Sequence, residues 1–237
     1  MSPVILLTLA IAPGIFWLWF FYRRDSLEPE PRWLLLRTFW LGVLIAIPIA
    51  LLQLPLATVV PSFLLFTLIA PLTEELGKYL MVRWTVYRQH DFDQPIDGMV
   101  YAAAIALGFA TIENIGYLLS ASQSTIILFG TTFSTTQTVL GTAIFRAVLS
   151  VPGHALWSSL WGYGLGLAKF APPQRARRLR QTGLLLAILS HASFNGLLVA
   201  APPAALGFLI LLPLAWRMTL RRFAVALALS PSAKEKD

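Results

Sequence analysis

The chain has 237 residues, of which 57% are hydrophobic and 12% are charged, and its mean hydropathy is +0.71. The charged fraction is about half that of an ordinary soluble domain, so a water-soluble globule is excluded. The absence of cysteine excludes disulfides, thiolate metal sites and a cysteine nucleophile. A net charge of +7 is compatible with nucleic-acid binding, but in a membrane protein a basic excess more often marks cytoplasmic loops.

Apolar runs, each about 20 residues long, predict an all-α, polytopic bundle of transmembrane helices. We expect seven spans, in chain order at residues 3–22, 33–54, 60–83, 98–120, 138–168, 182–200 and 204–220. They use the whole length, which predicts one integral membrane domain over residues 1–237.

Two features of the spans affect their shape. The fifth is long, so it tilts, protrudes into the cytoplasm, or begins with the polar stretch 134–138 folded as a surface turn. Pro48, Pro71 and Pro152 lie inside or beside spans and are expected to kink them, which opens space between helices.

Basic residues occur in every second connection between the predicted spans. The segments after the first, third, fifth and seventh spans carry Lys or Arg, the last of them including Lys234 and Lys236, whereas the connections at 53–58, 121–137 and 201–203 carry none. The positive-inside rule then places the N-terminus outside and the C-terminus in the cytoplasm. Topology thus explains the basic excess, and we expect a lipid bilayer rather than nucleic acid as the partner of these charges.

Once the basic residues in or beside the cytoplasmic connections are set aside, seven ionisable residues remain inside the predicted spans, where a charged side chain costs about 2.5–3.5 kcal/mol at mid-span. They are Glu74, Glu75, Lys78, Glu113, Arg146, His154 and His191, with Asn114 and Asn195 beside them. A bundle keeps such residues in its interior, usually for function. We therefore expect them to converge on one wet cavity.

The third predicted span carries two adjacent glutamates and a lysine. Glu74 and Lys78 are four residues apart in the acid-before-base order, which favours an ion pair along one helix face. Glu75 lies about 100° round the helix and is left to another partner or to a cavity. A structural ion pair between helices is the alternative interpretation of this motif.

The next three spans also carry polar residues at steps of four: Phe109 and Glu113, with Asn114 adjacent; then Arg146, Ser150, His154 and Ser158; then His191 and Asn195. A histidine and an asparagine on one helical face can hold a water or donate two hydrogen bonds to an oxyanion. A protonated glutamate bonded to a carbonyl, or a satisfied interhelical hydrogen bond from a histidine, would explain each residue alone.

Glutamate, histidine and asparagine together suit several chemistries. A carboxylate can take a proton from water, and histidine and asparagine donors can stabilise the oxyanion of amide hydrolysis. A proton-coupled transporter or channel could use the same residue types, and a non-catalytic membrane binding protein could keep the same fold. Transport is disfavoured because no discontinuous spans stand in matching positions of two halves.

Four motifs, in order and on separate spans, resemble the PrsW family of bacterial intramembrane proteases: Glu74-Glu75-x-x-Lys78, Phe109-x-x-x-Glu113-Asn114, His154, and His191-x-x-x-Asn195. The flanking Asp97-Gly98-Met99-Val100-Tyr101 and Phe145-Arg146 are similar too, and the similar region runs over about residues 71–196. The resemblance implies a peptidase of the bacterial cytoplasmic membrane that acts on a membrane-anchored protein. Members are implicated in site-one cleavage of membrane-anchored anti-sigma factors.

The resemblance also implies roles for individual residues. Because the family is similar to the glutamate-dependent membrane proteases that include the CAAX-prenyl endoproteases, Glu74 and Glu75 are implied as water-activating carboxylates and His191 with Asn195 as oxyanion donors. Glu113 stands where the CAAX proteases have histidine and Lys78 where they have arginine, which argues against a CAAX-type substrate. The implied catalytic set is completed by Glu113 and His154, and supported by Lys78, Asn114, Phe109 and Arg146.

The family has been described as a metalloprotease, and zinc is the alternative to metal-free catalysis. Glu113, His154 and His191 could form a site of two histidines and one carboxylate with an open position for water. Metal-free catalysis is favoured because no His-Glu-x-x-His pair exists, the histidines lie on different spans, and Asn195 suits an oxyanion hole.

Overall fold

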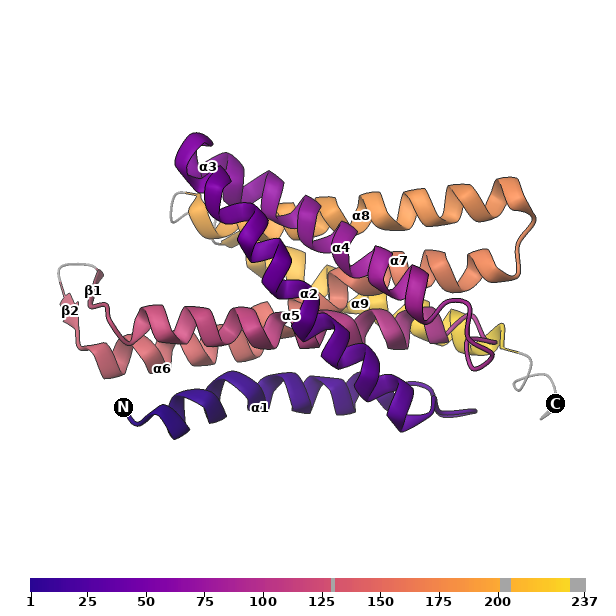
Figure 1. Cartoon of the computed structure of the whole chain (residues 1–237), viewed down its shortest axis with the longest axis horizontal. Helices are drawn as coiled ribbons and strands as arrows, with labels where there is room; N and C mark the ends of the chain where they lie inside the picture. The colour runs from indigo at the N-terminus through magenta and orange to yellow at the C-terminus, as the bar shows by residue number, and fades with distance from the viewer. Residues whose placement is uncertain (129–130, 201–205, 231–237) are drawn as a thin grey trace.

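A computed structural model describes residues 1–128, 131–200 and 206–230, which form a bundle of helices with one short β-hairpin (Figure 1). The unbroken long helices are α1 (Pro3–Tyr22), α2 (Arg32–Val59), α5 (Asp97–Ala121), α8 (Pro173–Val199) and α9 (Phe208–Ala228). Two further helical segments each contain a π-helical turn. One consists of α3 (Ser62–Leu64), η1 (Leu65–Ile69) and α4 (Ala70–Thr85), and the other of α6 (Thr135–Phe145), η2 (Arg146–Ser150) and α7 (Val151–Lys169).

The predicted all-α class is confirmed, and five helical segments are long and apolar enough to cross a membrane: Pro3–Tyr22, Arg32–Val59, Asp97–Ala121, Thr135–Lys169 and Pro173–Val199. The other two predicted spans also fall on helices, at 62–85 and 208–228, but these carry several charged residues. The connection 201–203, the start of the seventh predicted span at 204, Lys234 and Lys236 lie outside the described residues.

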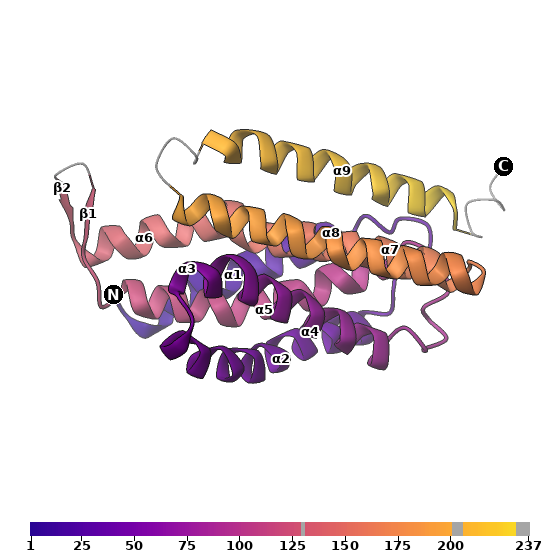
Figure 2. The same cartoon turned by 90° about the horizontal axis from the view of Figure 1, so that it is seen from above.

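The connection between α5 and α6 contains a hairpin that the hydropathy pattern does not predict. Its strands, β1 (Ile126–Leu128) and β2 (Thr131–Phe133), pair antiparallel. The N-terminus lies at the same end of the bundle as this hairpin, and the α1–α2 and α7–α8 connections lie at the opposite end (Figures 1 and 2). The hairpin and the N-terminus therefore mark one end of the bundle, and the α1–α2 and α7–α8 connections mark the other.

Helix α5 forms the centre of the bundle, where it packs against α1, α2 and α7. Its first half, residues 97–111, is entirely buried and rich in alanine. Gly108 of α5 faces Gly42 of α2, and a Cβ on either glycine would overlap a backbone oxygen of the other helix. Small residues of this kind let two helices approach to backbone contact.

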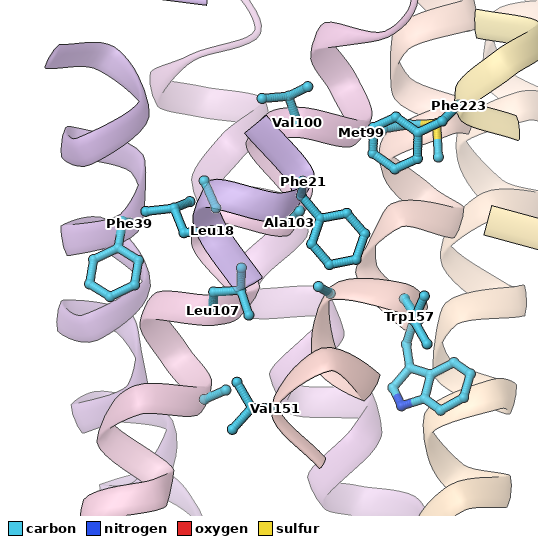
Figure 3. Packing of buried hydrophobic residues seen from close by; sticks show 14 of the residues in the cluster. Leu18, Phe21, Phe39, Met99, Val100, Ala103, Leu107, Val151, Trp157 and Phe223 are labelled. Atoms are coloured by element: carbon cyan, nitrogen blue, oxygen red, sulfur yellow. The ribbon is translucent and has the colours of Figure 1, made fainter. Parts of the chain in front are cut away.

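A shared apolar cluster holds α5 against the surrounding helices (Figure 3). Leu18 and Phe21 of α1, Leu107 of α5, Trp157 of α7 and Phe223 of α9 all belong to it. The outer faces of α1 and α2 instead expose leucine, isoleucine and tryptophan, the residues that a lipid-facing surface requires. The polar residues of the bundle are thus left to its interior.

At Pro71 and Pro152, where kinks are expected, the π-helical turns η1 and η2 each end two residues before the proline. Proline cannot donate the usual backbone hydrogen bond, and a π-helical turn accommodates the interruption by adding a residue to the turn. Glu74 follows η1 and His154 follows η2, so both turns lie next to predicted site residues. Pro48 lies within α2, which continues through it as a helix.

The polar stretch 134–138 is not a surface turn, so that alternative for the long fifth segment is wrong. Ser134 is the N-cap of α6, and its side chain accepts a hydrogen bond from the backbone N–H of Gln137. The Gln137 side chain in turn accepts one from the backbone N–H of Ser134 at 2.8 Å. This reciprocal cap starts the helix at Thr135.

Candidate active site

Glu75 of α4 is completely buried, and its carboxylate contacts four side chains. Oε1 lies 2.6 Å from Lys78 Nζ and 3.1 Å from His191 Nδ1. Oε2 accepts hydrogen bonds from Ser158 Oγ at 2.7 Å and Trp161 Nε1 at 3.0 Å. Since Ser158 and Trp161 belong to α7 and His191 to α8, this one carboxylate joins three helices.

Lys78 pairs with Glu75 and not, as predicted, with Glu74. Residues three apart also share a helix face, and both charged groups of the observed pair are fully buried. Hydrogen-bond donors from α7 and α8 surround Glu75 and stabilise its buried charge, so Lys78 pairs with Glu75 and not with Glu74. Lys78 Nζ also lies 4.8 Å from the centre of the Phe109 ring and 3.5 Å from His154 Nδ1.

A second polar network is built around Glu113 of α5. Its Oε2 accepts a hydrogen bond from Arg146 Nη2 at 2.6 Å and lies 2.9 Å from His154 Nε2. Asn114 accepts from Arg146 Nε at 2.7 Å and donates to the carbonyl oxygen of Ala10 at 2.9 Å. The network thus holds α1, α5, η2 and α7 together and neutralises Glu113 with one guanidinium.

Glu74 differs from the other two glutamates because its buried Oε2 has no hydrogen-bond partner among the described residues. This oxygen lies 3.9 Å from His191 Nε2. Glu74 lines a cavity of about 90 Å³ together with Gln53, Phe66, Ala70, Glu113, Tyr117, Arg146, Ser150, His154, His191, Asn195 and Leu198. The cavity therefore brings together every predicted catalytic residue except Glu75.

The two histidines meet edge to face at this cavity, with ring centres 4.9 Å apart. Asn195, four residues after His191, donates from Nδ2 to the carbonyl oxygen of Phe66 in η1 at 2.9 Å. This bond ties α8 to the π-helical turn that precedes Glu74. One of the two amide hydrogens of Asn195 is thus engaged by the backbone.

Two larger apolar cavities share residues with the small polar one. The first, of about 660 Å³, is lined by the hairpin residues Ile126 and Phe133 and by α6, and it shares Arg146 and Ser150 with the polar cavity. The second, of about 420 Å³, lies along α2 and α5 and shares Glu74 and Glu113 with it.

Three residues at the site were not singled out by the sequence. Trp161 gives no pattern that distinguishes it from a core aromatic residue. Gln53 was assigned to a connection, but α2 extends to Val59, and Gln53 donates to Thr73 Oγ1 at 2.9 Å. Tyr117, whose ring lies 4.1 Å from the Arg146 guanidinium carbon, follows Glu113 by four residues, a spacing that could have identified it.

The side chains that could share a metal ion differ from the predicted set. Glu74, His154 and His191 each offer a ligand atom within 4.8 Å of the others, so Glu74 replaces Glu113. The physical reason is that Arg146 and His154 already engage Glu113, whereas Glu74 Oε2 is unpartnered. Two imidazoles and one buried carboxylate are donors that zinc accepts in catalytic sites, so these residues fit the metal.

Comparison with known proteins identifies the family of the chain. The profile of the PrsW family intramembrane metalloproteases matches residues 30–218. Protease PrsW of Geobacillus kaustophilus (strain HTA426) is 39% identical over 199 residues, which cover 82% of this chain and 80% of the relative. Protease PrsW of Bacillus subtilis (strain 168) is 33% identical over 198 residues, 82% of this chain and 83% of the relative.

The chain belongs to the PrsW family. It is an intramembrane peptidase and an integral protein of the bacterial membrane. A third relative, Protease PrsW of Clostridioides difficile (strain 630), is 29% identical over 208 residues, 82% of this chain and 79% of the relative. No solved structure matches the chain.

The buried pair of this PrsW protein predicts a specific pattern of stability. Replacing Lys78 by methionine leaves Glu75 as a buried charge without its cation, which is expected to cost about 3–5 kcal/mol. The double variant Glu75→Gln/Lys78→Met removes both charges and is expected to recover most of that loss. Thermal unfolding of the purified variants in detergent measures both effects; equal losses in the single and double variants would contradict the assignment of the pair.

Proposed function

We propose that this PrsW protein hydrolyses a peptide bond of a membrane-anchored protein with a water molecule activated by Glu74. One observation carries the proposal: a buried carboxylate oxygen without a hydrogen-bond partner lines a small polar cavity beside two histidines. Burying such an oxygen without a partner is unfavourable, so a catalytic task accounts for it better than a structural one. A carboxylate in this setting can take a proton from water as it attacks the carbonyl carbon.

The neighbouring residues take separate roles in this proposal. Glu75 acts as a positioning residue, because its two oxygens already contact four side chains. Its Oε1 orients His191 through Nδ1 of the imidazole ring. Glu113, held by Arg146, orients His154 in the same way. We assign the oxyanion hole to the second amide hydrogen of Asn195 and to Nε2–H of His191. Because Nδ1–H of His191 donates to the Glu75 carboxylate, this role requires the His191 ring as the imidazolium cation.

The cavity of about 660 Å³ is the proposed binding groove for the substrate. Its lining is mostly apolar, which suits a transmembrane segment, and Arg146 and Ser150 connect it with the polar cavity. A protein with a single membrane anchor fits this groove, and an anti-sigma factor cleaved at site one is the specific candidate. Transport and a purely non-catalytic role are set aside because the chain belongs to a peptidase family.

We further infer seven spans with the N-terminus outside, from the alternation of basic connections. The substrate groove includes the hairpin, which lies at the N-terminal end of the bundle (Figure 1), so on this orientation it opens toward the outer face of the membrane. Cleavage would then release the outer part of the substrate.

The orientation can be tested because the natural chain has no cysteine. Thr132 of the hairpin and Gln174 of the α7–α8 end are both exposed, and each can be replaced singly by cysteine. A membrane-impermeant maleimide added to intact cells should label the Thr132→Cys variant only, and both variants after lysis. Labelling of the Gln174→Cys variant alone in intact cells would reverse the orientation.

The roles of the two adjacent glutamates predict different effects of substitution. The Glu74→Gln variant should lose about 10²–10⁴-fold in cleavage rate while keeping its melting temperature, because the amide replaces an unpartnered charge. The Glu75→Gln variant should lose both activity and stability. The matched control is Asp93→Asn at an exposed carboxylate.

The measurement is cleavage of a substrate in liposomes, together with thermal unfolding. The substrate is first identified by comparing membrane-bound and released protein fragments from cells that carry the wild-type or the Glu74→Gln protein. A folded Glu74→Gln variant that cleaves at the wild-type rate would remove Glu74 from the catalytic role.

One observation favours a second version of the chemistry, in which Glu74, His154 and His191 would hold zinc. Bound zinc would make a water molecule more acidic and polarise the substrate carbonyl. Glu113 would then be the carboxylate left to accept a proton, since its side chain lines the same cavity and is 25% exposed.

The metal-free version predicts less than one zinc per chain in the purified protein and full activity after treatment with 1,10-phenanthroline. Elemental analysis and the liposome cleavage assay measure these two quantities. One zinc per chain that disappears in the Glu74→Gln variant, with activity lost to the chelator and restored by zinc, would instead establish the zinc version.

A further inference from the structure

A second cluster of buried carboxylates lies at the end of the bundle opposite the hairpin, where the α1–α2 connection meets the start of α5 (Figure 1). Asp25 and Glu30 belong to the connection, and Asp97 is the first residue of α5. Their exposed fractions are 1%, 4% and 0%. Each offers a carboxylate oxygen within 4.8 Å of the others, and none of them lines the catalytic cavity.

Hydrogen bonds hold two of the three carboxylates and leave the third unheld. Glu30 Oε2 accepts from the hydroxyl of Tyr101, and Asp97 Oδ2 accepts from the backbone N–H groups of Asp93 and Gln94 at 2.8 and 2.6 Å. Asp97 also shares a side-chain hydrogen bond with Glu30, whereas both oxygens of Asp25 have no partner of normal hydrogen-bond geometry among the described residues. The N–H groups of Leu27 and Glu28 lie near Asp25 without forming such a bond.

Positive charge does not compensate the cluster either. Within the described ranges, no lysine or arginine forms an ion pair with any of the three carboxylates. Lys169, whose charge acts on Asp97, donates its hydrogen bonds to the carbonyl oxygens of Tyr87 and Gln89. Burial raises the pKa of Asp25 to about 6, and burial followed by the charge of Asp97 raises the pKa of Glu30 to about 10.

We propose that Asp25, Glu30 and Asp97 bind a hard divalent cation, Mg²⁺ or Ca²⁺, which joins the α1–α2 connection to the start of α5. The donors are all oxygens, the ligand type that these two ions prefer. Oxygens 4.8 Å apart can both reach one ion at about 2.4 Å, which lies within the Ca²⁺–oxygen range of about 2.3–2.6 Å, whereas Mg²⁺ at about 2.0–2.1 Å requires the carboxylates to move closer together. Both oxygens of Asp25 are free to bind the ion without breaking a hydrogen bond of the protein, whereas at Glu30 and Asp97 the ion replaces the proton that these two side chains share.

The test uses the full-length protein, purified in detergent, stripped with EDTA and dialysed. Calorimetric titration with Ca²⁺ alone and with Mg²⁺ alone should show one site for at least one of them, and the better ligand identifies the ion. The melting temperature should rise with the concentration of that ion. Asp25→Asn should weaken binding about tenfold or more. The matched control Asp93→Asn, at an exposed carboxylate whose charge acts on the cluster only from a distance, should weaken it far less.

Stability without the ion provides a second, independent readout. In EDTA the Asp25→Asn variant should melt at or above the wild-type temperature, since an amide replaces a buried, unpartnered charge. With the ion in excess it should melt below the wild type. If that variant does not fold, Glu30→Gln, which keeps an acceptor for Tyr101, takes its place.

Two results would overturn the proposal. Absence of saturable binding by either ion would mean that protons alone neutralise the cluster. Equal binding by the Asp25→Asn and Asp93→Asn variants, or loss of binding in the Glu74→Gln variant, would place the ion elsewhere, in the latter case in the catalytic cavity. Retained binding in the Glu74→Gln variant supports a site separate from the catalytic one.

Discussion

The structure of the site depends on the buried ion pair between Glu75 and Lys78. Removing two charges from water is costly, and their mutual attraction offsets that cost only when further hydrogen bonds satisfy the remaining lone pairs. Ser158, Trp161 and His191 supply those bonds, so α7 and α8 must meet α4 in one register. That register fixes the neighbouring Glu74, which lies about 100° round the helix from Glu75, at the polar cavity.

The distribution of charge inside the bundle then separates reactive from structural groups. Lys78 compensates Glu75, and Arg146 compensates Glu113. Glu74 remains as the carboxylate with an unpartnered buried oxygen. The two π-helical turns contribute because each stands shortly before a cavity residue, Glu74 or His154, and π-helical turns recur at functional sites.

The sequence was sufficient for features that the membrane itself imposes. A helix must be about 20 apolar residues long to cross the hydrocarbon, so the helical segments could be located. Lipid excludes charge, so the convergence of Glu74, Glu113, His154, His191 and Asn195 could be expected. The partner of Lys78 could not be predicted, because Glu75 and Glu74, three and four residues before it, share its helix face. Hydrogen-bond donors from other helices decide between the two glutamates. The same tertiary effect puts Glu74, in place of Glu113, in the group of side chains that could share a metal ion with the two histidines.

Glu74 and Asp25 show the same physical anomaly, a buried carboxylate oxygen without a partner, and their surroundings give it different meanings. Glu74 lines a cavity with two imidazoles, where a water molecule can be activated or a metal that accepts nitrogen ligands can be bound. Asp25 lies beside Glu30 and Asp97 at the far end of the bundle, where a hard cation would offset the repulsion between the carboxylates. A chain with few charges that leaves carboxylate oxygens unpaired at these two places concentrates its unfavourable electrostatics where a ligand can relieve them.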